Sequence, residues 1–566
     1  MVCWDRDLGE PAPAYPHQMR MCADRSYAPV AASGRVFVPS NATDSVTAYS
    51  LEDGRLEWRM VTGGPVRFAP VVSGDTVWFG SDDGYLYGVS AAAGTLRHRI
   101  RAVPESLPDS RMLINGRLCS RWPVRGGPVA YGGTVYFGAG IWPEEGVYVG
   151  AVDADTGDLR WRTDALSVIR HGMNDHNRQY DLSLPPHGYL AVVDGMLAVT
   201  SGRTRAAFLD PATGELEPYT SYYVKHHPPR GTWSVSGNDD FWIQGGNIFT
   251  TRADVLPPMP PDRLPLADFA RMAGLASAEV EERLAEMRRR HLKAAIIPGI
   301  QRLTLAGEGS ARTVQGPFGE PVASGLFVPS PVTDNEVFNF TNRVLVGADL
   351  YATANEVLYT DPVVTETTLV HSVFDNRGDY ILPRGDTHIR HPRYSRIVAR
   401  DLTNPAWAFQ VQWNGVIRKL AFPVKWELET PHKVLIRAGD RLIASGKNTV
   451  AGIQMPRDGE KARVAWDCEV KGTPVSALVA DEKLVVTTDQ GGLYCFGDRT
   501  DLPASRTAER PAAPADPMRR KRYALVLGWN EEVVSTLRED GTHRVIVLDP
   551  DAKRVRAVRQ RLAAED

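Results

Sequence analysis

The sequence predicts an all-β protein made of repeated four-stranded antiparallel sheets, and three observations lead to this prediction. Glycine-rich turns separate short runs of valine, alanine and aromatic residues, as in residues 126–138, where Gly132 and Gly133 divide two such runs. Glycine tolerates the positive φ of tight turns, and β-branched and aromatic residues favour strands. The 566 residues include 50 glycines and 41 prolines, as a fold with many turns requires. The pattern also recurs along the chain, and one such sheet buries both faces only by stacking on its copies.

Composition and charge exclude several classes of protein. A net charge of −3 offers no attraction to nucleic acid or to an anionic membrane. No run approaches the roughly 20 apolar residues needed to span a bilayer. The first residues, Met1 to Asp7, contain no apolar signal segment, so we expect the chain as written to be unexported. The cysteines form no CxxC motif and no adjacent pair, so we expect buried free thiols; they are Cys3, Cys22, Cys119, Cys468 and Cys495.

Repeats can be followed from the N-terminus. The first four lie at 27–66, 67–102, 126–163 and 185–220. In the first and third of these, a glycine precedes a tryptophan by four residues: Gly54 with Trp58, and Gly157 with Trp161. In the second and fourth, His98 and Pro218 stand at the place of the tryptophan. The connections 103–125 and 164–184 are long, and long loops in compact folds are often functional.

The turn from Ala151 to Trp161 has the pattern Ala-x-Asp-x-x-Thr-Gly-x-x-x-Trp. It resembles the hallmark turn of the pyrroloquinoline-quinone (PQQ) repeat β-propellers, which are also called quinoprotein-like propellers. The resemblance implies that each tryptophan of this kind docks between adjacent blades. We expect this docking role for Trp4, Trp58, Trp161, Trp407 and Trp466.

The remaining repeats give a count of eight blades over residues 1–499. A fifth starts at 233–252, and a helical insert follows at about 254–300. The others are a sixth ending at Trp407, a seventh at 430–470 and an eighth at 473–497. The eighth has only three strands, so we expect the strand around Trp4 to complete it and close the ring. The alternative is a frayed N-terminus.

The C-terminal residues form a separate element in this prediction. Residues 500–522 are a linker rich in proline, alanine and arginine, and 523–566 alternate strand, helix, strand and helix. Gly528 after the first strand and Asp549 at the end of the second resemble the opening of class I S-adenosylmethionine methyltransferases. That resemblance implies cofactor-binding roles for Gly528 and Asp549 in an incomplete α/β fragment.

Histidines gather in two connections between blades. One connection contains His171, Asp175 and His176, and the next contains His226 and His227. If both lie at the mouth of the ring, these side chains could converge on a metal or an anion. The alternative is that they are loop residues bonded to backbone or water. No HxH or HExxH spacing identifies a metal. Arg121, Arg125 and Arg170 are expected on the same face.

Three functions follow from these features. The resemblance implies either a quinone enzyme, with PQQ and a calcium ion held by Glu, Asn and Asp, or a cofactor-free scaffold. The sequence has no adjacent cysteine pair and no CxxCH haem motif, and the calcium ligands match no motif. We therefore expect a non-catalytic binding or scaffolding propeller that takes a protein or small-molecule ligand on one face. The alternatives are a PQQ-dependent dehydrogenase and an accessory propeller of a methyltransferase. Relatives of this kind are usually periplasmic or exported.

Overall fold

The structure is a computed structural model. It describes residues 2–15, 23–114, 116–175, 178–193, 195–201, 206–219, 221–222, 234–244, 247–249, 253–255, 265–272, 276–282, 285, 338–340, 343–345, 348–349, 362–374, 394–412, 415–457, 460–497, 522–539 and 543–565.

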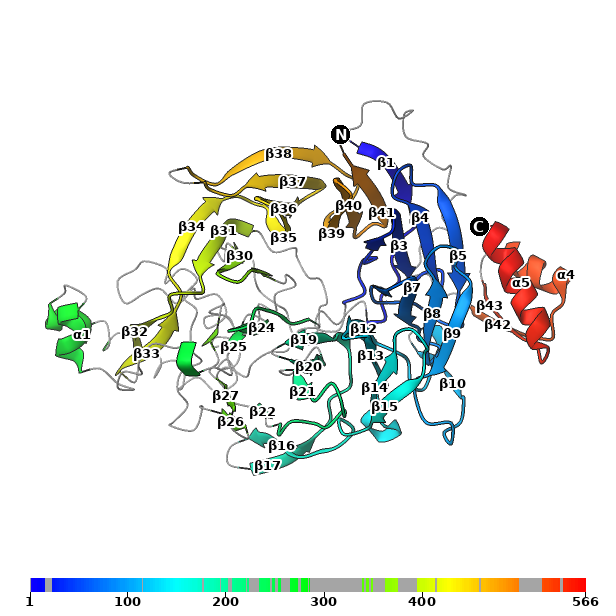
Figure 1. Cartoon of the computed structure of the whole chain (residues 1–566), viewed down its shortest axis with the longest axis horizontal. Helices are drawn as coiled ribbons and strands as arrows, with labels where there is room; N and C mark the ends of the chain where they lie inside the picture. Colours follow the sequence, from blue (N-terminus) through cyan, green and yellow to red (C-terminus); the bar gives the residue numbers. More distant parts are fainter. Residues whose placement is uncertain are drawn as a thin grey trace.

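Three antiparallel sheets of four sequential strands open the chain (Figure 1). In each sheet the second and third strands are almost wholly buried, because neighbouring sheets cover both of their faces. The first sheet comprises β2 (Val30–Ala32), β3 (Arg35–Ser40), β4 (Ser45–Ser50) and β5 (Leu56–Val61). The second comprises β6 (Val71–Ser73), β7 (Thr76–Gly80), β8 (Tyr85–Ser90) and β9 (Leu96–Arg101). The third comprises β12 (Gly126–Tyr131), β13 (Thr134–Ala139), β14 (Tyr148–Asp153) and β15 (Leu159–Thr163), with β18 (Gly188–Tyr189) parallel to β12.

Further sheets continue the series through the described residues. Next come β19 (Ala191–Val193), β20 (Met196–Val199) and β21 (Ala207–Leu209), then β23 (Ser236–Gly237), β24 (Trp242–Gln244), β25 (Asn247–Phe249) and β28 (Ala348–Asp349). They are followed by β29 (Val363–Val364), β30 (Thr368–Phe374), β31 (Tyr394–Asp401) and β34 (Val424–Glu429), and by β35 (Lys433–Ala438), β36 (Arg441–Gly446), β37 (Thr449–Gln454) and β38 (Arg463–Glu469). The last sheet contains β39 (Pro474–Ala480), β40 (Lys483–Thr488), β41 (Gly492–Phe496) and β1 (Val2–Asp7).

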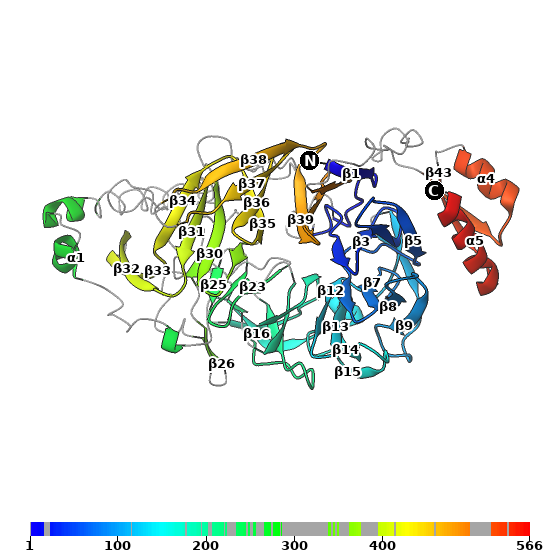
Figure 2. The same ribbon diagram turned by 45° about the horizontal axis from the view of Figure 1, so that its top comes forward.

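These sheets are set around a common centre, as Figures 1 and 2 show. Their first strands lie side by side in the order β23, β29, β35, β39, β2, β6, β12 and β19. Apolar side chains fill the space between consecutive sheets; between the first and second sheets, for example, Phe37 and Ala48 pack with Val77 and Tyr87. The predicted all-β propeller of antiparallel blades is confirmed. The total of eight blades stays a prediction.

The N-terminal strand closes the ring. β1 pairs antiparallel with β41, so that Trp4 lies opposite Cys495 and Asp7 lies opposite Gly492. The first and last strands of the propeller therefore belong to one sheet, and the prediction of closure through the strand around Trp4 is confirmed.

The outermost strands share one register. In five blades the docking residue of the fourth strand, a tryptophan or His98, lies opposite a glycine or alanine of the third strand, and a β-bulge follows directly. The pairs are Ala48 with Trp58, Gly88 with His98, Ala151 with Trp161, Ala399 with Trp426 and Gly452 with Trp466.

This register corrects one sequence-based assignment. Trp407 lies in β32 (Ala406–Gln412), which forms a hairpin with β33 (Gly415–Ala421) and belongs to no blade sheet. The hairpin is inserted between β31 and β34, so Trp426 in β34 takes the docking position of that blade. Trp426 also packs against the cluster that joins this sheet to the next.

Shorter elements decorate the ring. Connections between sheets carry the hairpin of β10 (Arg111–Ile114) and β11 (Arg117–Ser120) and the pair β16 (Ile169–Asp175) and β17 (Arg178–Leu182) with β22 (Ser221–Tyr222). The hairpin of β26 (Phe338–Phe340) and β27 (Arg343–Leu345) lies between β25 and β28 of one sheet. The short helices are η2 (Pro143–Glu145), η3 (Ala253–Val255) and α1 (Leu266–Met272), and residues 277–282 are also helical. None of the helices within the described ranges has the length and hydropathy to cross a membrane.

The C-terminal residues form a small parallel unit. Strands β42 (Arg522–Leu527) and β43 (His543–Leu548) pair in parallel, and they alternate with helices α4 (Glu531–Glu539) and α5 (Ala552–Glu565). Asn530 and Asp551 cap the two helices through their side-chain oxygens. Most of the predicted linker, 500–522, lies outside the described residues.

Candidate functional site

Three docking tryptophans join their blades to the next through one repeated contact. Their indole Nε1 donates to a carbonyl in the turn between the third and fourth strands of the following blade: Trp4 to Leu51 at 3.1 Å, Trp58 to Ala91 at 3.0 Å and Trp161 to Pro211 at 2.9 Å. The hydrogen bond satisfies the polar edge of a ring that is otherwise buried.

A glycine in the same turn makes this contact sterically possible. A Cβ atom on Gly54 would lie 2.5 Å from the Trp4 ring, and one on Gly94 would lie 2.5 Å from the Trp58 ring. Both glycines also have positive φ, of 67° and 65°. The glycine and the tryptophan of one repeat therefore make contacts with different blades: the glycine lies against the tryptophan of the preceding blade.

The two ends of the sheets differ in what they carry. We call turn face the end that holds the turns between first and second strands and between third and fourth strands, including the tryptophan contacts. We call connection face the opposite end, which holds the turns between second and third strands and the connections from blade to blade. The β10–β11 hairpin belongs to the connection face, as do residues 8–15 and 23–29, the described parts of the 8–29 connection from β1 to β2.

Four charged side chains form a buried row beneath the connection face. In this buried charge row, Asp24, Arg67, Asp82 and Arg125 alternate in sign, and each is at most 4% exposed. Arg125 binds both oxygens of Asp82 through Nε and Nη2, at 2.9 and 2.8 Å. Arg67 donates to Asp82 at 2.7 Å and to Asp24 at 2.5 Å. The row links four segments of the chain. Asp24 lies in the 8–29 connection and Arg67 in the connection from the first blade to the second. Asp82 lies in the β7–β8 turn of the second blade, and Arg125 in the connection to the third.

The neighbours of Asp82 and Arg125 keep both side chains charged. Burial alone would raise the pKa of Asp82, but the charges and hydrogen bonds of Arg125 and Arg67 outweigh it and hold that pKa well below its usual value. Burial opposes the charge of Arg125 as well, yet Asp82 keeps the pKa of this guanidinium raised. Cys119 lies beside the row, with Sγ at 3.5 Å from Asp82. Burial, with Asp82 as second cause, raises the pKa of this thiol to about 12.

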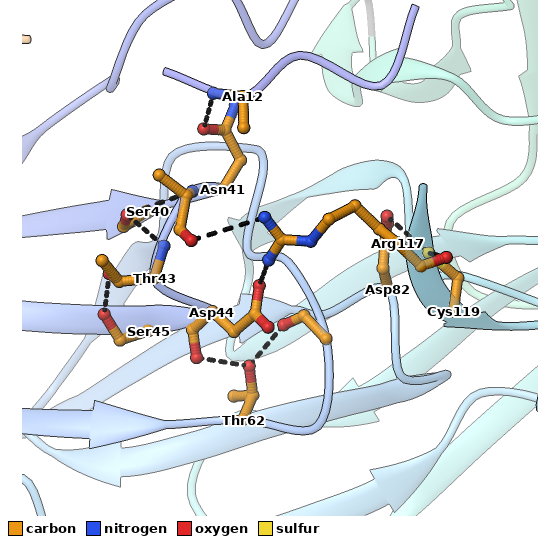
Figure 3. A network of polar contacts seen from close by, with 12 residues as sticks. Ala12, Ser40, Asn41, Thr43, Asp44, Ser45, Thr62, Asp82, Arg117 and Cys119 are labelled. Atoms are coloured by element: carbon orange, nitrogen blue, oxygen red, sulfur yellow. Dashed lines mark hydrogen bonds and ion pairs between the residues drawn. The ribbon is translucent and has the colours of Figure 1, made fainter. Parts of the chain in front are cut away.

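A second polar network extends the row toward the first blade (Figure 3). Arg117 of the β10–β11 hairpin forms an ion pair with Asp44 in the β3–β4 turn. Thr62 Oγ1 donates to the carbonyl oxygens of Asp44 and Gly64. Burial raises the pKa of Asp44, and Arg117 opposes this effect. The hairpin inserted between the second and third blades is therefore held down on the first blade.

The 8–29 connection is anchored at several blades. Ala12 N donates to Asn41 Oδ1 at 2.8 Å, and Asn41 Nδ2 donates to Asp24 O at 2.7 Å. At one end, Thr487 of the last blade donates to the carbonyl of Tyr27 at 2.6 Å. Elsewhere the Tyr15 ring lies under the Arg125 guanidinium at 5.5 Å. These contacts place the connection across several blades on the connection face.

The predicted histidine cluster is described only in part. His171 lies on β16 with φ of 55° and an exposed side chain, and its backbone N donates to Asp181. Asp175 ends β16, but its side chain lies outside the description, as do all of His176, His226 and His227. Among the residues that the structure describes, no three His, Cys, Asp or Glu side chains are grouped to hold a metal ion. The convergence of these residues stays a prediction.

The two residues singled out in the C-terminal unit lie at adjacent strand ends. Gly528 follows β42 with φ of 78°, and its N donates to the carbonyl of Leu548 at 2.7 Å. Asp549 follows β43 and accepts from the backbone N of Trp529 and of Asp551, each at 2.8 Å. These backbone bonds, with Arg554, lower the pKa of Asp549.

Comparisons with known proteins agree with this architecture. A family model of PQQ repeats, described as "Outer membrane protein assembly factor BamB", matches residues 2–139. Over these residues the chain is similar to the PQQ-repeat family. The matched residues include the strand of Trp4, the first two blades and the whole buried charge row. No curated protein matches the sequence.

Solved structures resemble the chain at low sequence identity. BamB from Moraxella catarrhalis is 10% identical, with 82% of each chain covered and a TM-score of 0.31. Quinohemoprotein alcohol dehydrogenase from Comamonas testosteroni is 12% identical, covering 89% of this chain and 77% of that one, with a TM-score of 0.41. The Pan2 WD40 domain from Neurospora crassa is 9% identical, covering 89% and 98%, with a TM-score of 0.37.

The sequence alone did not identify the buried charge row of this propeller. Arg125 was expected on the connection face, but Asp24, Arg67 and Asp82 were not singled out. One signal was present: Ser81, Asp82 and Asp83 follow directly after the fully buried strand β7. Three polar residues at the end of such a strand must find buried partners.

Proposed function

We propose that this chain is a non-catalytic binding propeller that takes a protein ligand on its connection face. The observation that supports the proposal most is the buried charge row with its attached loops. Long connections on the connection face are fixed in place by ion pairs at their bases, whereas the tryptophan contacts near the turn face join blades to each other. A rigid scaffold that presents positioned loops is how propellers and similar folds build binding surfaces.

The chemistry of the described groups supports binding rather than catalysis. Both Asp82 oxygens are bonded to arginines, so this carboxylate is a poor proton acceptor at neutral pH. The Cys119 thiol, with its raised pKa, is a poor nucleophile. Each buried titratable group of the row thus has a structural partner.

Substitutions on the two faces test the proposal. Leu113 in the β10–β11 hairpin and Tyr131 at the turn face are both 52% exposed, which makes them a matched pair. We expect Leu113→Asp to abolish capture of a specific partner in affinity purification, and Tyr131→Asp to leave it intact. Equal loss in both variants, or in neither, would contradict binding through the connection face.

A direct assay separates the proposal from the rival quinone enzyme. The purified protein is mixed with PQQ and calcium, and the quinone absorbance is followed, then dye reduction with alcohols and sugars. We expect no stoichiometric quinone binding. Tight binding with dye reduction would replace the proposal with a PQQ-dependent dehydrogenase.

A second candidate is that the propeller accompanies a methyltransferase. The specific observation is the parallel unit at 522–565, in which Gly528 and Asp549 lie at neighbouring strand ends. Asp549 already accepts two backbone hydrogen bonds and pairs with Arg554 at 3.2 Å. We therefore expect no calorimetric signal when S-adenosylmethionine is titrated into this chain, and measurable binding would favour the methyltransferase.

A further inference from the structure

We propose that Arg67, backed by Arg125, is a binding site for the carboxylate of an extended acidic peptide, and that Asp24 occupies this site as an internal ligand. The inference rests on the proposed function, because it names the chemistry of the ligand that the connection face takes.

Asp24 holds the position of a ligand rather than of a blade residue. It belongs to no strand and reaches the row from the connection between β1 and β2. Asp82 and Arg125, by contrast, lie within two residues of blade strands β7 and β12, and Arg67 lies in the short connection between β5 and β6. The Asp24 carboxylate meets Arg67 at 2.5 Å and also accepts from the backbone N of Ala14 at 2.9 Å.

The charges of the row determine which charge a ligand in place of Asp24 must carry. With Asp24 in place, two arginines face two aspartates, and the row is neutral. Without it, Arg67 and Arg125 face Asp82 alone, which leaves one buried positive charge. The nearby groups have other partners: Asp44 pairs with Arg117, and the buried Asp83 accepts from Gly63 N and Tyr87 rather than from the two arginines. The raised pKa of Cys119 keeps its thiol neutral. A buried arginine without a full complement of anions is unfavourable, so an anion must take the place of Asp24.

The internal ligand leaves two atoms of the row unsatisfied. Oδ1 of Asp24 and Nη1 of Arg125 are buried, and neither has a hydrogen-bond partner among the described residues. Buried charged groups normally satisfy all their hydrogen-bonding atoms. A ligand that replaces Asp24 and also supplies an acceptor for Nη1 of Arg125 would satisfy the row more fully than Asp24 does.

Backbone contacts around the site indicate a peptide. Asn41 binds the connection through both ends of its amide, to Ala12 N and to Asp24 O. Arg67 Nη1 also donates to the carbonyl of Ala12 at 3.1 Å. A donor and an acceptor aimed at main-chain groups recognise an extended chain, whereas an isolated anion would use the guanidinium alone.

Competition between the internal and external carboxylates gives the test. The probe is a fluorescein-labelled peptide of alternating aspartate and alanine, and binding to the full chain is followed by fluorescence anisotropy. We expect Asp24→Asn, which keeps the shape and removes the charge, to bind the peptide at least ten-fold more tightly than the wild type. Adding Arg67→Gln to Asp24→Asn should abolish this gain, and a peptide of alternating lysine and alanine should not bind.

A second measurement needs no variant. In the wild type, an excess of the acidic peptide should speed hydrogen exchange at the amides of Ala12 and Ala14, because displacement breaks their bonds to Asn41 and Asp24. The inference is overturned if exchange is unchanged, or if a folded Asp24→Asn variant binds the peptide no better than the wild type. If either of these results is found while Leu113→Asp still abolishes partner capture, the proposed site for an acidic peptide is wrong, and the proposed binding function stands. If Leu113→Asp also has no effect, both are wrong.

Discussion

Replacing Trp4 by alanine should be one of the most damaging single changes in this chain. The side chain is 3% exposed and packs between the last and first blades. Burying a tryptophan removes roughly 200 Å² from water, which at about 25 cal/mol per Å² corresponds to at most about 5 kcal/mol. Measured tryptophan-to-alanine changes cost about 3–5 kcal/mol. The lost hydrogen bond to Leu51 adds about 1 kcal/mol. We expect the free energy of unfolding to fall by about 4 kcal/mol.

Equilibrium denaturation followed by tryptophan fluorescence and circular dichroism measures this loss. Trp58→Ala is the matched comparison, since Trp58 makes the same contact one blade later and is 8% exposed. Val2→Ala, on the same strand as Trp4 but 40% exposed, is the control and should change stability by less than about 0.5 kcal/mol. If Trp4→Ala costs no more than Val2→Ala, the closing strand contributes little to stability and the reasoning fails.

Three further changes test other parts of the structure. Gly54→Ala and Gly34→Ala both place a side chain at positive φ, which costs about 1–2 kcal/mol, but only Gly54 lies under Trp4, so its variant should lose about 1–3 kcal/mol more; equal denaturation midpoints would contradict the packing. The Cys119 thiol, whose pKa burial raises to about 12, should react with an aromatic disulfide reagent at pH 8 only after unfolding, and labelling of Cys119 itself in the native protein, located by peptide mass mapping, would contradict its burial. Because the pKa of Asp82 is lowered on folding, its stabilisation is present above its ordinary pKa of 3.8 and is lost as the pH falls below it, at up to about 1.4 kcal/mol per pH unit; Asp82→Asn should reduce this acid sensitivity, and an unchanged slope between pH 4 and 2 would refute it.

Local patterns made much of the fold predictable. A glycine followed by a tryptophan four residues later encodes one turn and one docking side chain, and both lie within a single repeat. The strand around Trp4 could be assigned because the last repeat lacked such a strand. The sixth blade was misassigned because Trp407 is the first tryptophan after β31, and the hairpin of residues 406–421 moves the true docking residue to Trp426.

The buried charge row could not be predicted from any local pattern. Arg67 and Asp82 are 15 residues apart, and Arg125 is 43 residues beyond Asp82, so only the ring brings them together. In sequence, each of them resembles an ordinary surface charge in a loop. Their partners depend on how three blades and one connection meet, which periodicity does not encode.

The closure of the ring by β1 has a consequence for synthesis. The strand Val2–Asp7 leaves the ribosome long before its pairing partner, Gly492–Phe496, which follows about 490 residues later; at roughly 5–20 residues per second, the delay is on the order of 25–100 s. For that period the strand that carries Trp4 has no native partner, and the first blade lacks the neighbour that packs against it in the closed ring. The nascent chain is therefore exposed to mispairing and to chaperone binding at this strand.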